Sequence, residues 1–131
     1  NREGIEAGNV RMGVMVETPA AVMLIDEFSE YVDFFSVGTN DLTQYTLAMD
    51  RDNMALSAYY DICHPAVMKE LLAVAKKARV LGKPVSICGE LASDVRALER
   101  LINMGYDKLS MPAGRIAGIR AAVADIHYKE A

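Results

Sequence analysis

Several features that would assign a protein to a class are scarce or missing in this sequence. It has only two cysteines, Cys63 and Cys88, far apart and outside any Cys-x-x-Cys motif. This usage favours free thiols over a disulfide framework or a cysteine-based metal cluster. No apolar run approaches the roughly 20 residues that span a bilayer, and the opening residues NREGIEAGNV lack the basic and apolar regions of a signal peptide. We therefore expect a cytoplasmic protein without membrane insertion.

An excess of basic charge is also missing. The net charge is −4 and the isoelectric point is about 5.1, so long-range attraction to nucleic acid or to an anionic membrane is not expected. Any bound anion must therefore be held by local groups. What the sequence does have is apolar material: 52% of its 131 residues are hydrophobic, which fits a single domain over residues 1–131 with a substantial core.

Short apolar stretches give way to turns and then to helical patterns four times along the chain. This alternation is the signature of βα units and a parallel sheet. The expected strands are residues 12–17, 34–37, 84–88 and 108–111. Each is nearly continuous in apolar residues, which predicts strands covered on both faces.

Helix signals follow these strands. Thr18 is a candidate cap with Pro19 at the first helical position, and Ser93 precedes another helical pattern. The longest helix is expected over residues 65–81, where apolar positions recur at three- and four-residue steps. Residues 50–64 form a longer connection, which we interpret as a loop over the site.

Four βα units are compatible with two architectures. One is a small open sheet, and the other is half of an eight-stranded (βα)₈ barrel, which typically takes about 250 residues. A half barrel would leave two apolar strand edges unpaired, so another copy or the missing half would have to cover them. The predicted fold class is α/β, with parallel βα repeats.

Polar residues gather where three of the expected strands end. They are Glu17 after the first strand, Gly38-Thr39-Asn40-Asp41 after the second and Cys88-Gly89-Glu90 after the third. In parallel α/β folds the carboxyl ends of the strands form the rim where ligands bind and reacting groups converge. These residues are therefore the candidate site.

Glu17 and Asp41 are candidate metal ligands. From adjacent strand ends they would offer two carboxylates to one Mg²⁺, which commonly takes one or two carboxylates plus phosphate oxygens and water. Simpler interpretations remain open at this point. Glu17 is also a plausible helix-start carboxylate, and Asp41 a cap or first-turn acid of a helix over residues 42–48.

The turn between these acids has the composition of an anion site. Gly38 lets the backbone approach a ligand closely, and the amides around Thr39 and Asn40 would point at an anion at the helix start, although turns of this composition are common. Arg51 follows Asp41 by ten residues, and a helix of that length would return it to the same rim. Its guanidinium fork suits phosphate or carboxylate. The alternative is an exposed arginine in a charged loop.

The cysteines allow two interpretations each. Cys88 is either a small buried hydrophobic residue or a functional acid or nucleophile, depending on its pKa. Cys63 stands beside His64, but adjacent loop residues rarely form a catalytic dyad. No function is assigned to Cys63 or His64.

Three blocks of this sequence, in the expected order, resemble a known family. DFFSVGTNDLTQYTLAMDR resembles the second signature of phosphoenolpyruvate-utilising enzymes, and MGVMVETPAA and SICGELASD match two further blocks. The likeness covers residues 11–126 and is greatest to the enzyme I branch, the phosphotransferases of bacterial sugar phosphotransferase systems. Pyruvate phosphate dikinase and phosphoenolpyruvate synthase are near relatives.

This resemblance implies a fold and a set of site residues. The implied fold is the last four βα units of a phosphoenolpyruvate-binding (βα)₈ barrel. The implied Mg²⁺ ligands, with Mn²⁺ as an alternative ion, are Glu17 and Asp41. The implied phosphoenolpyruvate contacts are Asn40, Arg51 and the loop around Gly38 and Thr39; the proton donor is Cys88, and Glu90 is a supporting residue.

The resemblance also implies partners that are not found in these residues. In the family the phosphate passes to a histidine on a separate domain and on to a phosphocarrier protein. Neither His64 nor His127 lies in a motif resembling that acceptor, and the first half of the barrel is missing as well. Residues 112–115, PAGR, depart from the family pattern after the last strand, so their contacts are left unassigned. A homodimer is expected.

Three functional hypotheses follow. The first is Mg²⁺-dependent phosphoryl transfer from phosphoenolpyruvate to a histidine, with release of pyruvate, by a parent enzyme of the enzyme I, synthase or dikinase type. The second is a non-catalytic association module, since exposed half-barrel edges favour pairing. The third is a metal-dependent lyase of the citrate-lyase type, against which Arg51 and the Cys88-Gly89-Glu90 motif argue.

Overall fold

The computed structural model describes residues 8–126 as an α/β fold built on one parallel sheet. Four strands lie in the order β1-β2-β3-β4, and all three neighbouring pairs are parallel. The strands are β1 (Gly13–Val16), β2 (Phe34–Gly38), β3 (Val85–Cys88) and β4 (Lys108–Ser110). The four expected strands are thus confirmed, each within two residues of its predicted ends.

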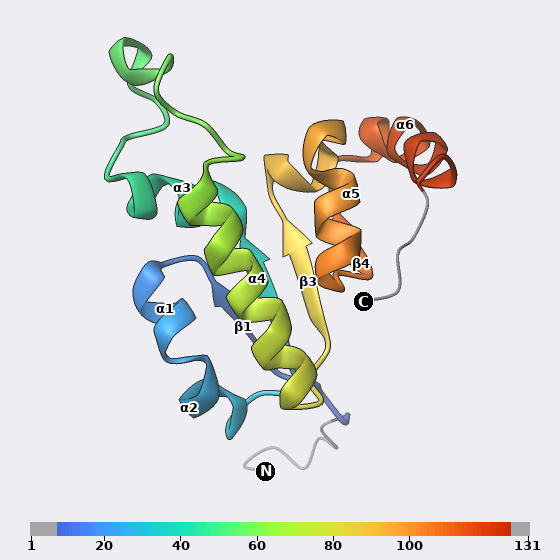
Figure 1. Ribbon diagram of the computed structural model, residues 1–131. Coiled ribbons are helices and arrows are strands. Elements are labelled where there is room, and N and C mark those ends of the chain that lie inside the picture. The colour runs from blue at the N-terminus through green and yellow to red at the C-terminus, as the bar shows by residue number, and fades with distance from the viewer. Residues whose placement is uncertain (1–7, 127–131) are drawn as a thin grey trace.

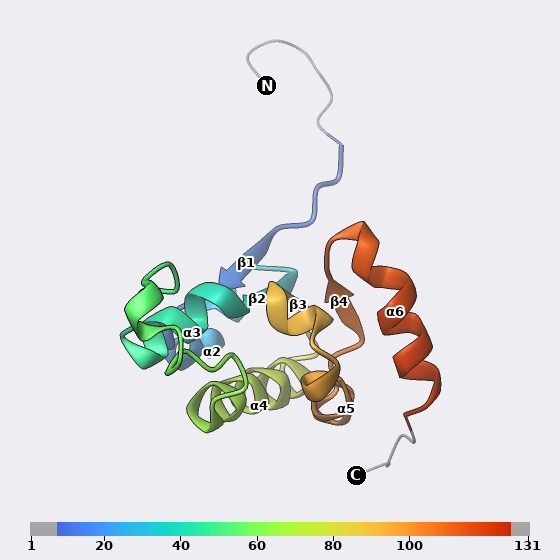
Figure 2. The same ribbon diagram turned by 90° about the horizontal axis from the view of Figure 1, so that it is seen from above.

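Helices follow every strand and lie along one side of the sheet (Figures 1 and 2). They are α1 (Pro19–Met23) and α2 (Ile25–Ser29) after β1; α3 (Thr39–Leu47), η1 (Met54–Leu56) and α4 (Pro65–Val80) after β2; η2 (Glu90–Ser93) and α5 (Val95–Met104) after β3; and α6 (Ala113–Ala124) after β4. Four consecutive βα units in this order have the architecture of one half of a (βα)₈ barrel.

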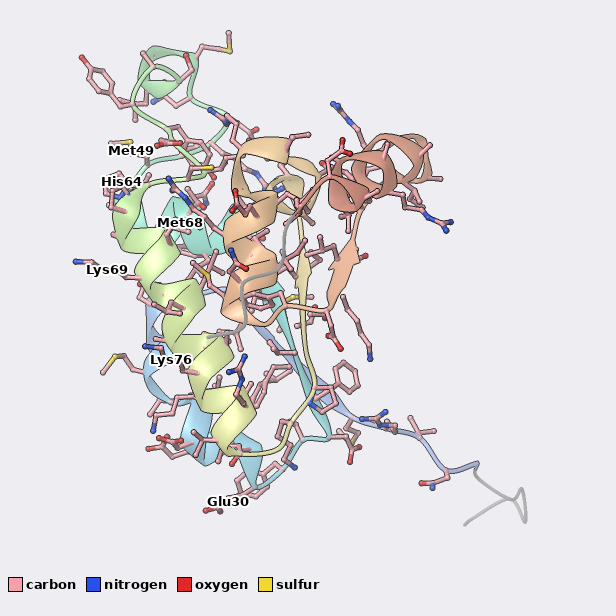
Figure 3. The ribbon with its side chains drawn as sticks, turned by 45° about the vertical axis from the view of Figure 1, so that its right-hand side comes forward. Glu30, Met49, His64, Met68, Lys69 and Lys76 are labelled. Atoms are coloured by element: carbon pink, nitrogen blue, oxygen red, sulfur yellow. The ribbon has the colours of Figure 1, made fainter. Side chains whose placement is uncertain are left out.

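The core lies between the sheet and its helices. Alternate strand residues point into it: Phe35, Val37 and Ile87 are fully buried. On the helix side the main contribution comes from α4, whose Leu71 and Val74 are fully buried in the same cluster. On the opposite side of α4, Lys69 and Lys76 extend away from the body of the protein (Figure 3). The apolar side chains at every second strand position therefore pack the sheet against its helices.

The other face of the sheet is not covered by the described residues. Met15 is 43% exposed, and Ser36, Ser86 and Cys88 are only partly buried. The prediction that both faces would be covered is therefore wrong for residues 8–126. The apolar runs misled it because Val14 and Met15, although both apolar, point to opposite faces of β1.

Capping side chains mark the starts of α1 and α5. The Thr18 side chain accepts a hydrogen bond from the Ala21 N–H at 3.1 Å, and Pro19 is the first residue of α1, as expected. Ser93 precedes α5 but does not cap it: Ser93 ends η2, and Asp94 caps α5 by accepting from the Arg96 N–H at 2.8 Å. Both residue types are good caps, so composition does not separate two adjacent candidates.

Within residues 8–126, none of the helices combines the length and the apolar character that crossing a membrane demands.

Candidate functional site

The register of the sheet brings the polar strand ends to one edge. Val16 pairs with Val37, so Glu17, the next residue, lies level with Gly38. Gly38 in turn pairs with Cys88 on the following strand. The ends of β1, β2 and β3 therefore form one continuous rim.

Gly38 makes room for the Glu17 carboxylate. A Cβ at position 38 would lie 2.9 Å from both Cβ and Oε2 of Glu17, which is closer than van der Waals contact allows. The absence of a side chain here is thus required by the packing of Glu17 against the backbone. The close approach predicted for Gly38 was to a ligand; in the structure its neighbour is a carboxylate of the protein itself.

Helix α3 begins directly at the end of β2. Its N-cap is Gly38, which makes no side-chain capping bond, and Asp41 lies in its first turn. The interpretation of Asp41 as an N-cap is therefore wrong, and its interpretation as a first-turn acid is confirmed. A carboxylate at this position is stabilised by the free amides and the dipole at the start of the helix.

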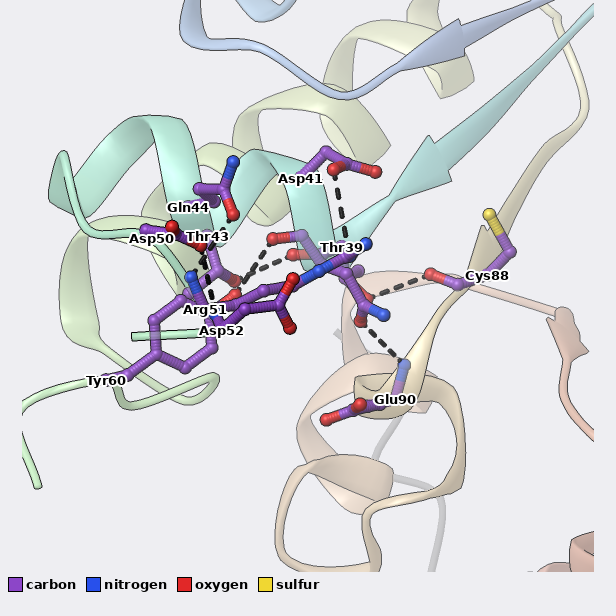
Figure 4. A network of polar contacts seen from close by, with 11 residues as sticks. Thr39, Asp41, Thr43, Gln44, Asp50, Arg51, Asp52, Tyr60, Cys88 and Glu90 are labelled. Carbon is purple, nitrogen blue, oxygen red and sulfur yellow. Dashed lines mark hydrogen bonds and ion pairs between the residues drawn. The ribbon is translucent and has the colours of Figure 1, made fainter. Parts of the chain in front are cut away.

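Thr39 ties the ends of β2 and β3 together. Its side chain is 1% exposed, and its hydroxyl donates to the Cys88 carbonyl at 2.9 Å (Figure 4). This hydroxyl is therefore used inside the protein and is not available to a ligand.

Asn40 is fixed from the neighbouring turn. Its Oδ1 accepts a hydrogen bond from the Glu90 N–H at 2.9 Å, so the side-chain amide group keeps its two N–H donors for other partners. Gly89 permits this approach, because a Cβ there would lie 2.8 Å from Asn40 Oδ1 and 2.5 Å from the Thr39 hydroxyl. Its φ of 104° is also a conformation that favours glycine.

Arg51 returns to the rim, although it is not carried there by the helix of about ten residues that was expected. Helix α3 ends at Leu47, Ala48 adopts a left-handed conformation, and the Arg51 N–H donates to Gln44 Oε1 at 3.2 Å. Arg51 Nη1 then lies 3.7 Å from Asp41 Oδ1, with both side chains 41% exposed. A pair this exposed adds little stability, so the guanidinium and the carboxylate both remain accessible to ligands.

Cys88 points to the uncovered face of the sheet. Its thiol is within 3.3 Å of the Val37 carbonyl and 3.5 Å of Met15 Sδ, and the Ser36 hydroxyl lies 3.8 Å away. The side chain is partly exposed, so its interpretation as a fully buried hydrophobic residue is not borne out. The sulfur contact with Met15 was not anticipated from the sequence, since the two residues are 73 positions apart.

Cys63 and His64 do not form a catalytic pair. His64 is the N-cap of α4, and its Nδ1 accepts from the Ala66 N–H at 3.2 Å. Burial raises the pKa of the Cys63 thiol, with a further contribution from the Asp94 carboxylate, which is itself held by Arg96. A thiol with a raised pKa is a poorer nucleophile at neutral pH.

Two parts of the site were missed by sequence reasoning. The first is Tyr60, whose hydroxyl donates to the Asn40 carbonyl at 2.9 Å. The second is a cavity of about 710 Å³ between the ends of β3 and β4. Asn40 and Glu90 line one part of it and Arg115 another, whereas Glu17, Asp41 and Arg51 lie outside it. No sequence signal distinguishes Tyr60 from the neighbouring Tyr59.

The donor set of Glu17 and Asp41 fits Mg²⁺. Within residues 8–126, no group of three or more His, Cys, Asp or Glu side chains is placed to enclose a metal ion. Two carboxylates at one rim, with remaining positions open to substrate and water, match the preference of Mg²⁺ for one or two protein carboxylates plus phosphate oxygens. The absence of a closed nitrogen and sulfur set among these residues does not match a structural zinc site.

Comparison with known proteins finds a family model and relatives for this chain. The family model described as "PEP-utilising enzyme, PEP-binding domain" matches residues 1–128. A protein of Escherichia coli K12, "Phosphoenolpyruvate-dependent phosphotransferase system", is 41% identical over 98% of this chain and 17% of its own length. The "Phosphoenolpyruvate-protein phosphotransferase" of Haemophilus influenzae is 43% identical over 94% of this chain and 21% of its own. That of Streptococcus equinus is 44% identical over 91% and 21%. The chain thus spans about a fifth of each relative.

Proposed function

Since the chain belongs to the family of phosphoenolpyruvate (PEP)-utilising enzymes and matches their PEP-binding domain, we propose that it contributes the carboxyl-terminal half of a PEP-binding barrel. The parent enzyme transfers the phosphoryl group of PEP to a histidine on another domain and releases pyruvate, as part of a phosphotransferase system. The observation that best supports this proposal is the return of Arg51 to within 3.7 Å of Asp41. A guanidinium, which suits phosphate, and a carboxylate, which suits Mg²⁺, thus lie side by side at the rim.

Each group at the rim has a role in binding. Glu17 and Asp41 would hold Mg²⁺, which on binding supplies positive charge to the carboxylate and phosphate oxygens of PEP. Arg51 offers its planar guanidinium to the phosphoryl oxygens, and the free N–H groups of the Asn40 amide donate to the same anion. The first amides of α3, around Thr39, add a further set of donors.

Two side chains of the chain act in the reaction: Arg51 in phosphoryl transfer and Cys88 in the protonation that follows. As the bond between phosphorus and the C2 oxygen breaks, its electron pair stays on that oxygen and leaves the enolate of pyruvate, while the phosphoryl group goes to the histidine nitrogen. Arg51 neutralises the phosphoryl oxygens during this transfer. Cys88 then gives its thiol proton to the methylene carbon of the enolate, which completes pyruvate and leaves a thiolate.

A PEP synthase or a pyruvate phosphate dikinase is the alternative parent enzyme. A second class of function, association with another copy or with the rest of a barrel, is favoured by the uncovered face on which Met15 is 43% exposed. A homodimer of the parent is part of the same proposal.

Calorimetric titration with PEP tests the proposal, using the longest polypeptide that the gene encodes. We expect binding that needs Mg²⁺ or Mn²⁺ and that weakens about tenfold or more in Arg51→Ala, the loss typical of a hydrogen bond to a charged group. Arg100→Ala, an exposed arginine on α5, is the matched control and should bind as the wild type does. PEP binding that is absent, or indifferent to both EDTA and Arg51→Ala, would contradict the assignment.

A further inference from the structure

In the connection between α3 and α4, Ile62 and Cys63 pack against the core, and Tyr60 makes a hydrogen bond to α3. Tyr60 lies in this connection, beyond Arg51, and its hydroxyl donates to the Asn40 carbonyl at 2.9 Å (Figure 4). Its neighbour Tyr59 has the same chemistry but is 69% exposed. Of two adjacent tyrosines, one therefore faces the rim and the other faces solvent.

Hydrogen bonds elsewhere in this connection are internal. Asp50 and Asn53 bond to the turns that follow them, and Asp61 bonds to the Cys63 N–H. In the described part of the chain, the Tyr60 hydroxyl makes the one hydrogen bond that joins residues 52–63 to another element. The near end of the connection is held separately, where the Arg51 N–H donates to Gln44. Arg51 is thus one point of attachment, and Tyr60 is the next along the chain.

Asn40 does not depend on this contact for its own position. Its backbone lies in the first turn of α3, and its side chain is fixed by the Glu90 N–H. The Tyr60 ring is partly buried, so burial raises the pKa of its hydroxyl, and the charges of Arg51, Glu90 and Asp41 also act on it. The hydroxyl is therefore a neutral donor, set among the charged groups of the rim, at any physiological pH.

We infer that Tyr60 is a positioning residue for Arg51. Its hydroxyl holds the far end of the connection against α3, so that the guanidinium stays at the rim, ready for the phosphate of the substrate. The inference rests on the proposed function, because it assigns Arg51 to PEP. What the hydroxyl contributes is preorganisation, since it reduces the freedom that Arg51 must lose when an anion binds.

The test compares Tyr60→Phe with Tyr59→Phe, each of which removes a single hydroxyl and keeps its ring. Titration of the full-length protein with PEP and Mg²⁺ should give three- to tenfold weaker binding for Tyr60→Phe, roughly the effect of one hydrogen bond. Tyr59→Phe should bind as the wild type does. Equal affinities for the two variants would overturn the inference.

A double-mutant cycle separates positioning from a general structural role. If Tyr60 acts through Arg51, Tyr60→Phe should cause no further loss of affinity when Arg51 is already alanine. The same three- to tenfold loss in both backgrounds would show that Tyr60 acts elsewhere and would overturn the inference.

Hydrogen exchange without PEP gives a readout that does not depend on the proposed function. Amides of residues 49–60 should exchange at least about threefold faster in Tyr60→Phe, while those of α4 keep their protection and report that the protein is folded. Unchanged exchange in the connection would overturn the inference even if PEP binds. If the wild type fails to bind PEP but the connection loosens, the proposed function fails while the attachment by Tyr60 stands.

Discussion

The two faces of the sheet carry different residues and different tasks. On the helix-covered face, Phe35, Val37 and Ile87 are fully buried and apolar. On the uncovered face the alternating positions of the same strands hold Ser36, Ser86 and Cys88, which are partly exposed. Residues one position apart in a strand therefore serve either the core or the site.

This difference indicates which residues contribute to stability and which contribute to the site. The pleat sends neighbouring side chains to opposite faces, so a strand can hold a core on one side while its other side varies. The core and the site adjoin at the rim, because Thr39 is buried in the fold and its hydroxyl donates a hydrogen bond from α3 to the Cys88 carbonyl. Substitutions on the two faces should accordingly have very different effects.

The largest effect is expected from the covered face. Phe35→Ala should lower the free energy of unfolding by about 3–5 kcal/mol, because it leaves a cavity at a fully buried position. Ser36→Ala, the next residue on the opposite face, should change it by about 0.5 kcal/mol or less. Urea unfolding followed by circular dichroism measures both. Comparable losses would break the distinction between the faces.

A smaller effect is expected from a polar group within the covered layer. Tyr106 is 2% exposed, its hydroxyl donates to the Leu71 carbonyl at 2.9 Å, and burial raises its pKa above the usual value. As pH rises above about 10, the unfolded chain loses this proton while the folded chain keeps it, so stability should fall. Tyr106→Phe should cost about 1 kcal/mol at neutral pH.

The same variant should also make the alkaline decline of stability shallower. Unfolding free energies between pH 8 and 11 measure the slope in both proteins. Part of the decline in unfolding free energy should remain in the variant, because the pKa of Tyr60 is also raised. An unchanged slope in Tyr106→Phe would mean that this buried hydroxyl does not link pH to stability.

Much of the fold could be predicted from the sequence, because its signals are local. Apolar runs followed by turn residues located all four strands, and the Thr18-Pro19 pair located the start of α1. What failed depends on tertiary context. The number of covered faces cannot be read from a run such as Val14-Met15-Val16, where apolar residues occupy both faces and only Val16 is fully buried.

The site was predictable to a similar degree. The rim follows from strand ends and spacing, and Arg51 returns to Asp41 because α3 has nine residues and Ala48 turns the chain after it. The tie between Asn40 and Glu90 and the contact of Tyr60 with Asn40 join segments that no periodicity relates. Such contacts depend on how loops pack, which a single sequence does not specify.

The separation of chemistry from stability is tested most directly at Cys88, on the uncovered face. In Cys88→Ala of the full-length enzyme, we predict an unfolding free energy within about 1 kcal/mol of the wild type and retained PEP binding by calorimetry. Exchange of the PEP methylene protons with solvent, followed by NMR, should be abolished together with pyruvate formation. Equal losses of binding and exchange, or a severe loss of stability, would contradict the account.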